Sequence, residues 1–222
     1  MSRILVVAHS GSMGTDDDSL DSVKMGIAMG TDVVEIDVRF EQDGTPILSH
    51  DKPRPGRKYE RVSDAIALLN EAPGVYLNAD MKEKNSRKGL SELKSILERY
   101  NMKDRMYFSG IERCKSGLLL EYFSEYEYLT DWNMNIIRRH SNSYIQSLVD
   151  KAKALGYSGF NLYHRYLTEK MVNFFHEKEM KVYTWTVEKE TDMQRLVDWG
   201  VDSITTRNPP LLREVLARNG KV

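Results

Sequence analysis

Residues 4–38 read ILVVAHSGSMGTDDDSLDSVKMGIAMGTDVVEIDV, and the pattern within this stretch recurs along the chain. The apolar run at residues 4–8 predicts a buried strand, and residues 19–29 carry apolar side chains at the spacing of an amphipathic helix. A second apolar run, at residues 33–38, predicts the next strand. Strand, helix and strand in this order are typical of a parallel sheet whose strands are connected through helices.

The same alternation continues to the last residues of the sequence. Eight strands are predicted at residues 4–8, 33–38, 75–81, 106–109, 126–130, 159–162, 181–187 and 203–206. Helices are predicted at residues 19–29, 63–69, 87–100, 115–122, 144–155, 168–178, 190–199 and 210–217. Eight such units in 222 residues favour a closed (β/α)8 TIM barrel, formed by residues 1–222 as a single domain.

Two alternatives to this organisation stay open. An open, doubly wound sheet has the same order of strands and helices, because a single sequence does not show closure. The fifth unit is the least regular, since residues 124–135 (SEYEYLTDWNMN) fit either a strand or a lid-forming loop.

Composition narrows the class of protein. The 32 basic and 33 acidic side chains give a formal net charge of −1, so the chain has no overall field that attracts nucleic acid or an acidic membrane. The single cysteine, Cys114, cannot form an internal disulfide, which favours a reducing compartment. The apolar run before His9 is too short for a signal peptide or a membrane span. We expect a cytoplasmic protein with no nucleic-acid partner and no stable membrane insertion.

One segment interrupts the alternation. Residues 39–50 read RFEQDGTPILSH, and Asp-Gly between two extended runs predicts a tight β-hairpin after the second strand. With Asp43 and Gly44 as the two loop residues, Asp37 lies directly across from His50. The hairpin then returns His50 to the level of Asp37 and of Glu35, whose side chain points to the same side of the strand.

Polar residues gather where the first three barrel strands end. The carboxyl ends of the strands form one face of a (β/α)8 barrel, so these residues are expected at one rim. Carboxylate oxygens suit Mg²⁺, Ca²⁺ or Mn²⁺, and imidazoles suit acid and base duty. The candidate residues are the carboxylates Glu35, Asp37 and Asp80, the imidazoles His9 and His50, and the ammonium of Lys82.

The order of these elements resembles the glycerophosphodiester phosphodiesterase family. That family opens with a His-Arg-Gly turn, continues with Glu-Asn-Thr and Glu-x-Asp, and has His-Asp after a hairpin and then a Glu-x-Lys strand. The matching residues are His9-Ser10-Gly11, Asp17-Asp18-Ser19, Glu35-Ile36-Asp37, His50-Asp51 and Asp80-Met81-Lys82. Residues 182–187 (VYTWTV) and 200–206 (GVDSITT) are similar to the family's closing strands, so the resemblance covers nearly the whole chain.

The resemblance implies metal-dependent hydrolysis of glycerophosphodiesters to glycerol 3-phosphate and an alcohol, an activity of lipid and glycerol metabolism. In the family's proposed route the glycerol 2-hydroxyl attacks first, and water opens the resulting cyclic phosphate. Matched positions imply that Glu35, Asp37 and Asp80 bind a divalent metal, that His9 and His50 are the acid and base, that Lys82 contacts phosphate and that Trp185 forms an apolar wall. The structural alternatives are a solvated loop for Lys82 and a core position for Trp185.

Three positions depart from the family pattern. Ser10 occupies the position of the family's arginine, so the resemblance implies a place beside the substrate, but serine lacks the two-pronged phosphate donor of arginine. Asp17, expected behind the site, and Asp80 replace glutamates and are each one methylene shorter. The alternatives are therefore a catalytically impaired barrel that binds phosphorylated ligands, or a phosphodiesterase for a different head group. The basic loop at residues 52–61 (KPRPGRKYER) is a candidate to restore the missing charge, with a solvated loop as the alternative.

Overall fold

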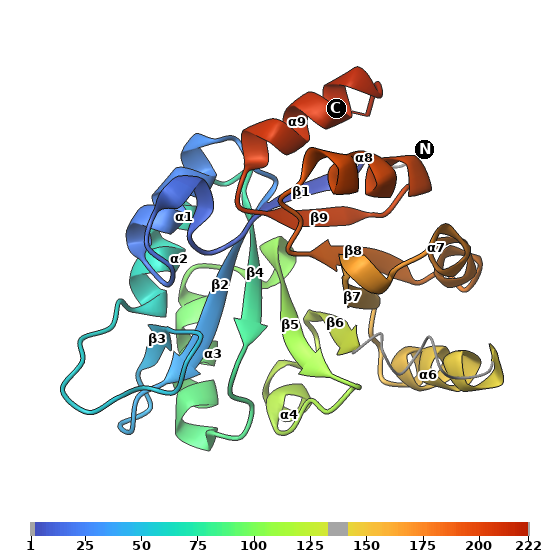
Figure 1. The fold of residues 1–222 in the computed structure, drawn as a ribbon. Helices are drawn as coiled ribbons and strands as arrows, with labels where there is room; N and C mark the ends of the chain where they lie inside the picture. The colour runs from blue at the N-terminus through green and yellow to red at the C-terminus, as the bar shows by residue number, and fades with distance from the viewer. Residues whose placement is uncertain (1–2, 133–141, 222) are drawn as a thin grey trace.

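The computed structural model describes residues 3–132 and 142–221, and its parallel strands close into a barrel (Figure 1). The strands are β1 (Leu5–Ala8), β2 (Val33–Phe40), β4 (Tyr76–Met81), β5 (Met106–Glu112), β6 (Glu127–Trp132), β7 (Gly159–Tyr163), β8 (Lys181–Trp185) and β9 (Ser203–Thr206). Strand β1 pairs in parallel with both β2 and β9, which completes the ring. The predicted (β/α)8 barrel is confirmed, and the open sheet is excluded.

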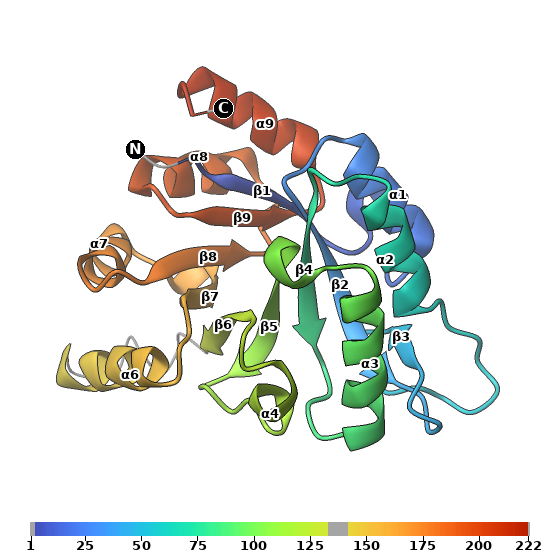
Figure 2. The same ribbon diagram turned by 180° about the vertical axis from the view of Figure 1, so that it is seen from behind.

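Helices surround the strands on the outside, as Figures 1 and 2 show from opposite sides. They are α1 (Leu20–Ala28), α2 (Val62–Asn70), α3 (Arg87–Arg99), α4 (Leu119–Phe123), α6 (Asn142–Ala154), α7 (Glu169–Glu177), α8 (Glu190–Trp199) and α9 (Pro209–Arg218). Short 3-10 turns lie at Ser12–Gly14, Lys103–Arg105 and His164–Tyr166. Within the described ranges, no helix has both the length and the apolar character needed to cross a bilayer.

Local sequence explains several of these boundaries. Ser19 and Ser86 begin α1 and α3 by accepting a hydrogen bond from a backbone N–H of the first turn, as N-cap residues do. Asn208 caps α9 in the same way, and prolines occupy its first two positions. In the irregular fifth unit, Glu127–Trp132 forms a strand, and residues 133–135 lie outside the described residues.

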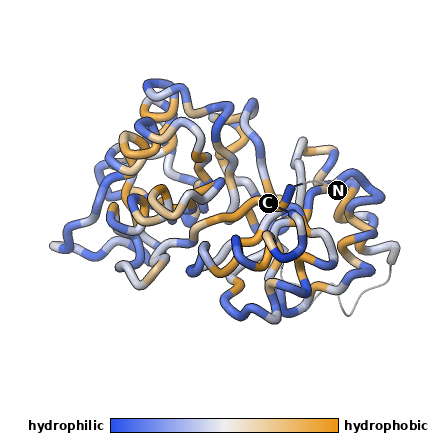
Figure 3. Tube along the Cα trace, turned by 90° about the horizontal axis from the view of Figure 1, so that it is seen from above, coloured by the Kyte–Doolittle hydropathy of each residue, from blue (hydrophilic) through white to orange (hydrophobic). Residues whose placement is uncertain are grey.

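Two sets of apolar side chains hold the barrel together. The larger set packs between the strands and the helices. Figure 3 shows hydrophobic and hydrophilic stretches alternating along the whole trace, as buried strands and amphipathic helices require. The smaller set fills the barrel interior with Val7, Val33, Tyr107, Leu129 and Tyr183. Side chains alternate along a strand, so residues two positions further on face the same interior nearer its carboxyl end. The small apolar cluster therefore forms the floor beneath the polar residues of that end.

The hairpin after β2 is confirmed, but its predicted register is wrong by one residue. Strand β2 pairs antiparallel with β3 (Pro46–Leu48), and Ser49 rather than His50 stands across from Asp37, with Ser49 N donating to Asp37 O over 3.0 Å. The loop consists of residues 42–44, because Glu41 N donates to the carbonyl oxygen of Thr45. Gly44 has φ of 91°, a conformation typical of the last residue in a three-residue hairpin loop.

Candidate active site

Three carboxylates converge at the carboxyl ends of β2 and β4. Glu35, Asp37 and Asp80 each offer one oxygen, and these oxygens lie within 4.8 Å of one another. The parallel register places Asp37 beside Asp80, and Glu35 lies two residues earlier on the same face of β2. The structure thus brings together the three acids that the sequence predicts as metal ligands.

The charges of this cluster do not balance. Lys82 Nζ lies 3.0 Å from Asp37 Oδ1 and 2.9 Å from Asp80 Oδ2. Burial and the nearby Asp80 raise the pKa of Glu35 to about 7, while burial and Glu35 raise the pKa of Asp37 to about 8. Burial disfavours the charged form of Lys82, but the carboxylates of Asp80 and Asp37 raise its pKa. When the three carboxylates are ionised, they outnumber the one ammonium that pairs with them, Lys82, so the cluster carries a surplus of negative charge.

The cluster fits a divalent cation. Asp80 Oδ1 is buried and has no hydrogen-bond donor among the residues that the structure describes. A buried carboxylate oxygen without a donor is costly unless a cation or a proton compensates it. Hard oxygen ligands and surplus negative charge are together the donor set that Mg²⁺, Ca²⁺ and Mn²⁺ prefer.

The two candidate histidines reach the site from different loops. His9 follows β1, and its Nδ1 lies 2.6 Å from the carbonyl oxygen of Ser10. A carbonyl oxygen only accepts, so Nδ1 carries the proton and Nε2 of a neutral ring is left as an acceptor. His50 follows the hairpin with 67% of its side chain exposed, and its Nδ1 lies 3.2 Å from Asp51 Oδ1.

A cavity of about 410 Å³ connects these groups. Seven of the nine predicted site residues line it, and Ser10 and Asp17 do not. The seven are His9, His50, Glu35, Asp37, Asp80, Lys82 and Trp185. Trp185, at the end of β8, has 37% of its surface exposed, and its ring lies 5.3 Å from that of Tyr163. Trp185 is therefore a wall of the cavity rather than a core residue.

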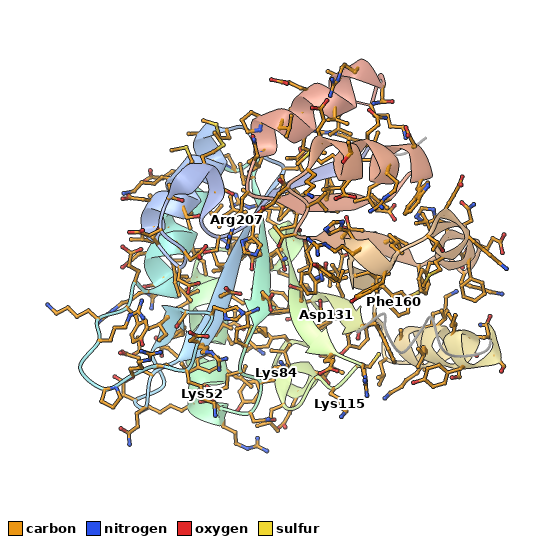
Figure 4. All side chains as sticks on the ribbon, in the orientation of Figure 1. Lys52, Lys84, Lys115, Asp131, Phe160 and Arg207 are labelled. Atoms are coloured by element: carbon orange, nitrogen blue, oxygen red, sulfur yellow. The ribbon has the colours of Figure 1, made fainter. Side chains whose placement is uncertain are left out.

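Several polar residues that line this cavity were not predicted from the sequence, among them Asp131 on β6 and Asn161 on β7. Asn161 Nδ2 donates to Asp131 Oδ1 over 2.7 Å, and Asp131 Oδ2 is buried without a hydrogen-bond partner in the described part of the chain. Burial and Asp80 raise the pKa of Asp131 to about 7. Figure 4 labels Asp131 at the end of β6. The signal was its position two residues after the apolar Leu129, matching Glu35 after Val33.

Comparison with known proteins identifies the family to which the chain belongs. Residues 8–69 and 60–211 match the glycerophosphoryl diester phosphodiesterase family. The chain belongs to this family. It is accordingly a phosphoric diester hydrolase, and membership supports glycerophosphodiester hydrolysis as the activity.

Individual relatives agree with this assignment over nearly their whole length. A glycerophosphodiester phosphodiesterase from Caldanaerobacter subterraneus is 23% identical, covering 98% of this chain and 100% of the relative. A phosphodiesterase from Oleispira antarctica, solved with the product sn-glycerol-3-phosphate, has a TM-score of 0.79 at 17% identity, covering 97% of each chain. A glycerophosphodiester phosphodiesterase from Parabacteroides distasonis has a TM-score of 0.77 at 16% identity, covering 99% of each chain. These structural likenesses establish the shared barrel.

Two of the residues that depart from the family pattern lie beside the cavity rather than in its wall. Ser10 is buried, its N donates to Glu35 Oε2 over 3.0 Å, and its Oγ accepts from Asp18 N over 2.6 Å. Ser10 thus fixes the turn after β1 and orients a candidate metal ligand. Asp17 Oδ1 accepts from Arg207 Nη2 over 2.9 Å, and Asp17 lines a second cavity together with His9 and Asp37.

A glycine on β5 leaves room for Asp80. Gly110 has φ of 73° at the irregularity where β5 shifts register against β6, and a Cβ there would lie 2.1 Å from Asp80 Oδ1. Gly110→Ala is therefore expected to lower the free energy of unfolding by more than about 1 kcal/mol and to weaken divalent-cation affinity by displacing Asp80. Denaturant unfolding and calorimetric metal titration measure the two effects.

The matched control is Gly74→Ala, because a Cβ at Gly74 meets no atom within 4 Å. This variant is expected to keep parental metal affinity. Parental affinity in Gly110→Ala as well would show that Asp80 does not depend on the space beside it.

Proposed function

We propose that this phosphodiesterase hydrolyses glycerophosphodiesters to sn-glycerol 3-phosphate and an alcohol, with a divalent cation held by Glu35, Asp37 and Asp80. The observation that carries the proposal is one cavity lined by these three carboxylates and by both His9 and His50. A divalent cation, when bound there, would polarise a phosphate oxygen and lower the pKa of a nearby hydroxyl.

The histidines divide the proton transfers. His9 Nδ1 keeps its proton and donates it in a hydrogen bond to the carbonyl oxygen of Ser10, so Nε2 is free. Nε2 accepts the proton of the attacking hydroxyl as the hydroxyl oxygen bonds to phosphorus. As the bond from phosphorus to the leaving oxygen breaks, His50 donates a proton to that oxygen and the alcohol departs. Attack by the glycerol 2-hydroxyl leaves a cyclic phosphate, and water then adds to its phosphorus and opens the ring to sn-glycerol 3-phosphate. The exposed position of His50 at the rim suits an alcohol that departs toward solvent.

The remaining residues bind and orient the substrate. Lys82, held between Asp37 and Asp80, supplies positive charge beside the phosphate. Trp185, with Tyr163 behind it, supports the carbon part of the substrate. Ser10 and Asp17 support the turn that carries His9. The cytoplasmic location, the single domain and the lack of a nucleic-acid partner remain predictions from the sequence.

The test is an assay of sn-glycerol 3-phosphate release from glycerophosphodiesters that carry different alcohols, with Mg²⁺, Ca²⁺, Mn²⁺ or EDTA. We expect release that requires one of the metals and stops with EDTA. Full turnover in EDTA would contradict the metal requirement. Turnover of other diesters alone would favour a different head group, and ligand-induced stabilisation without turnover would favour the impaired barrel.

A further inference from the structure

Ser10 and Asp17, two of the residues that depart from the family pattern, both contact the side chain of Arg207. Arg207 follows β9 directly, and its Nε donates to the carbonyl oxygen of Ser10 over 3.2 Å. Its Nη2 lies 2.9 Å from Asp17 Oδ1. An arginine 197 residues away along the chain thus lies against the turn where the family pattern has its own arginine.

The backbone around Arg207 is fixed to the same turn. His9 N donates to the carbonyl oxygen of Thr206 over 3.0 Å, and Met13 N donates to the carbonyl oxygen of Arg207 over 2.9 Å. These bonds extend the pairing of β1 with β9 beyond the strands. Figure 4 labels Arg207 on the side of the barrel that β1 and β9 form. The guanidinium is therefore held beside His9 by the fold itself.

Arg207 also opens onto the active site. It lines a second cavity of about 490 Å³, which shares His9, Asp37 and His50 with the first. The side chain of Arg207 is 42% exposed, so a ligand can reach it. A guanidinium has five N–H donors, and the contacts with Ser10 and Asp17 use two of them.

We propose that Arg207 binds a phosphate oxygen of the substrate in place of the arginine that Ser10 lacks. The proposal rests on the proposed function for its substrate and deepens it. Asp17 orients the guanidinium, and the free N–H groups offer the charge-assisted, two-pronged contact that phosphate favours. Serine stands at position 10 where the family has arginine, and Arg207 then carries the positive charge to the same place. The chain has moved this charge rather than lost its contact with the substrate.

The structure provides a matched control in the basic loop at residues 52–61, which was a candidate to restore this charge. Arg57 lines the same second cavity, but its guanidinium lies 5.2 Å from the centre of the Tyr59 ring. No contact with the turn after β1 holds Arg57 among the described residues. Arg207→Gln and Arg57→Gln therefore remove one positive charge each from the same opening, and they differ in whether that charge is held beside His9.

The experiment measures KM and kcat for a glycerophosphodiester and the affinity for inorganic phosphate. Arg207→Gln is expected to raise KM about tenfold or more and to weaken phosphate binding similarly, with little change in kcat. A contact made equally in the ground and transition states affects KM in this way. Arg57→Gln is expected to change KM and the phosphate affinity by less than about threefold. Arg207→Lys keeps the positive charge but lacks the two-pronged guanidinium, so its KM and phosphate affinity are expected to lie between those of the parent and Arg207→Gln.

Two results would overturn the proposal. The first is KM and phosphate affinity in Arg207→Gln no worse than in Arg57→Gln. The second is a lower melting temperature or kcat with unchanged KM, which would assign Arg207 a purely structural role. If no diester is hydrolysed by the parent, phosphate affinity in the same variants still tests Arg207, so failure of the proposed function is separate.

A rescue variant adds a second line of support. Ser10→Arg in the Arg207→Gln background is expected to recover phosphate affinity, because it returns a guanidinium to the family position. Ser10→Arg alone is expected to lower KM little, since Arg207 already lies there. Ser10 is only 5% exposed, so folding of both variants is checked by thermal unfolding. A folded double variant that recovers no phosphate affinity would contradict the relocation of the charge.

Discussion

Replacement of His9 by alanine is expected to lower kcat by about two to four orders of magnitude while the fold and the metal affinity stay intact. The ring is anchored through Nδ1 to the carbonyl oxygen of Ser10, whereas the carboxylates of the acid cluster are held by Ser10 N and Lys82 Nζ. Alanine therefore removes the proton acceptor and leaves the carboxylates in place. Steady-state kinetics, with metal titration by calorimetry on the same sample, measure both quantities.

His50→Ala is expected to cause a loss of kcat in the same range for the proton donor. The side chain is 67% exposed, so its removal is expected to leave the melting temperature nearly unchanged. His176→Ala is the control, because His176 pairs with Asp202 ahead of β9, at the opposite end of the barrel. Near-parental kcat in His9→Ala or in His50→Ala would make that histidine a structural residue.

The sequence predicted the acid cluster because strand periodicity and the parallel order of the strands together determine it. Apolar neighbours on β2 identify a buried strand, and alternation then places Glu35 and Asp37 on one face. Parallel pairing of β2 with β4 then adds the third carboxylate, because it brings Asp80 beside Asp37. No long-range information beyond the order of strands was needed.

Details that depend on a single residue of register were not predictable in the same way. The hairpin loop has three residues instead of two, and Gly44 satisfies either geometry, so the sequence did not distinguish them. Asp131 was missed because candidate residues were taken only from the ends of the first three barrel strands. The fifth predicted strand also ended at Thr130, two residues before the end of β6 at Trp132.

The position of Arg207 lies beyond sequence reasoning for a different reason. Its partners Ser10 and Asp17 are 197 and 190 residues away along the chain. Only closure of the barrel between β1 and β9 brings them together. The sequence showed that a positive charge was missing at Ser10, and the nearest basic segment, residues 52–61, was the natural candidate. The fold provides another one from the opposite end of the chain.

The metal-free protein is expected to lose stability as pH rises from about 5 to about 8. The pKa values of Glu35 and Asp37 are raised to about 7 and about 8, above the values near 4 expected in the unfolded chain. The native state therefore binds more protons than the unfolded state in this window, and its free energy of unfolding falls as those protons leave. Thermal unfolding in EDTA at a series of pH values measures the slope.

A divalent cation is expected to reverse this loss, because it replaces the departing protons as the partner of the carboxylates. At a hundredfold excess over Kd, binding contributes about 2.7 kcal/mol, which corresponds to roughly 5–10 °C in melting temperature for a chain of this size. At one fixed metal concentration the gain is expected to be larger at pH 8 than at pH 6, because Kd falls as the carboxylates lose their protons. Equal gains at both values would show that the carboxylates are already ionised at pH 6.

Glu35→Gln is expected to change the metal-free and the metal-loaded protein in opposite directions. Without metal, the amide removes one buried charge, keeps an oxygen that can accept from Ser10 N, and raises the melting temperature at pH 8 by a few degrees, roughly the effect of 1 kcal/mol or more. With metal, the lost ligand reduces both the cation-induced gain and the diesterase activity.

The opposite signs separate a metal ligand from an ordinary buried acid. If Glu35 were only a buried acid, Glu35→Gln would raise the metal-free melting temperature and leave the metal-induced gain unchanged. If Glu35 is a metal ligand, the same variant raises the metal-free melting temperature and also reduces the metal-induced gain. Glu112→Gln is the control, since Glu112 lines the same cavity with 65% of its side chain exposed and lies beside Arg113 rather than in the acid cluster. It is expected to keep the metal-induced gain. An unchanged gain in Glu35→Gln would exclude Glu35 from the metal site, because neutralising a direct ligand of a divalent cation always weakens the electrostatic part of its binding.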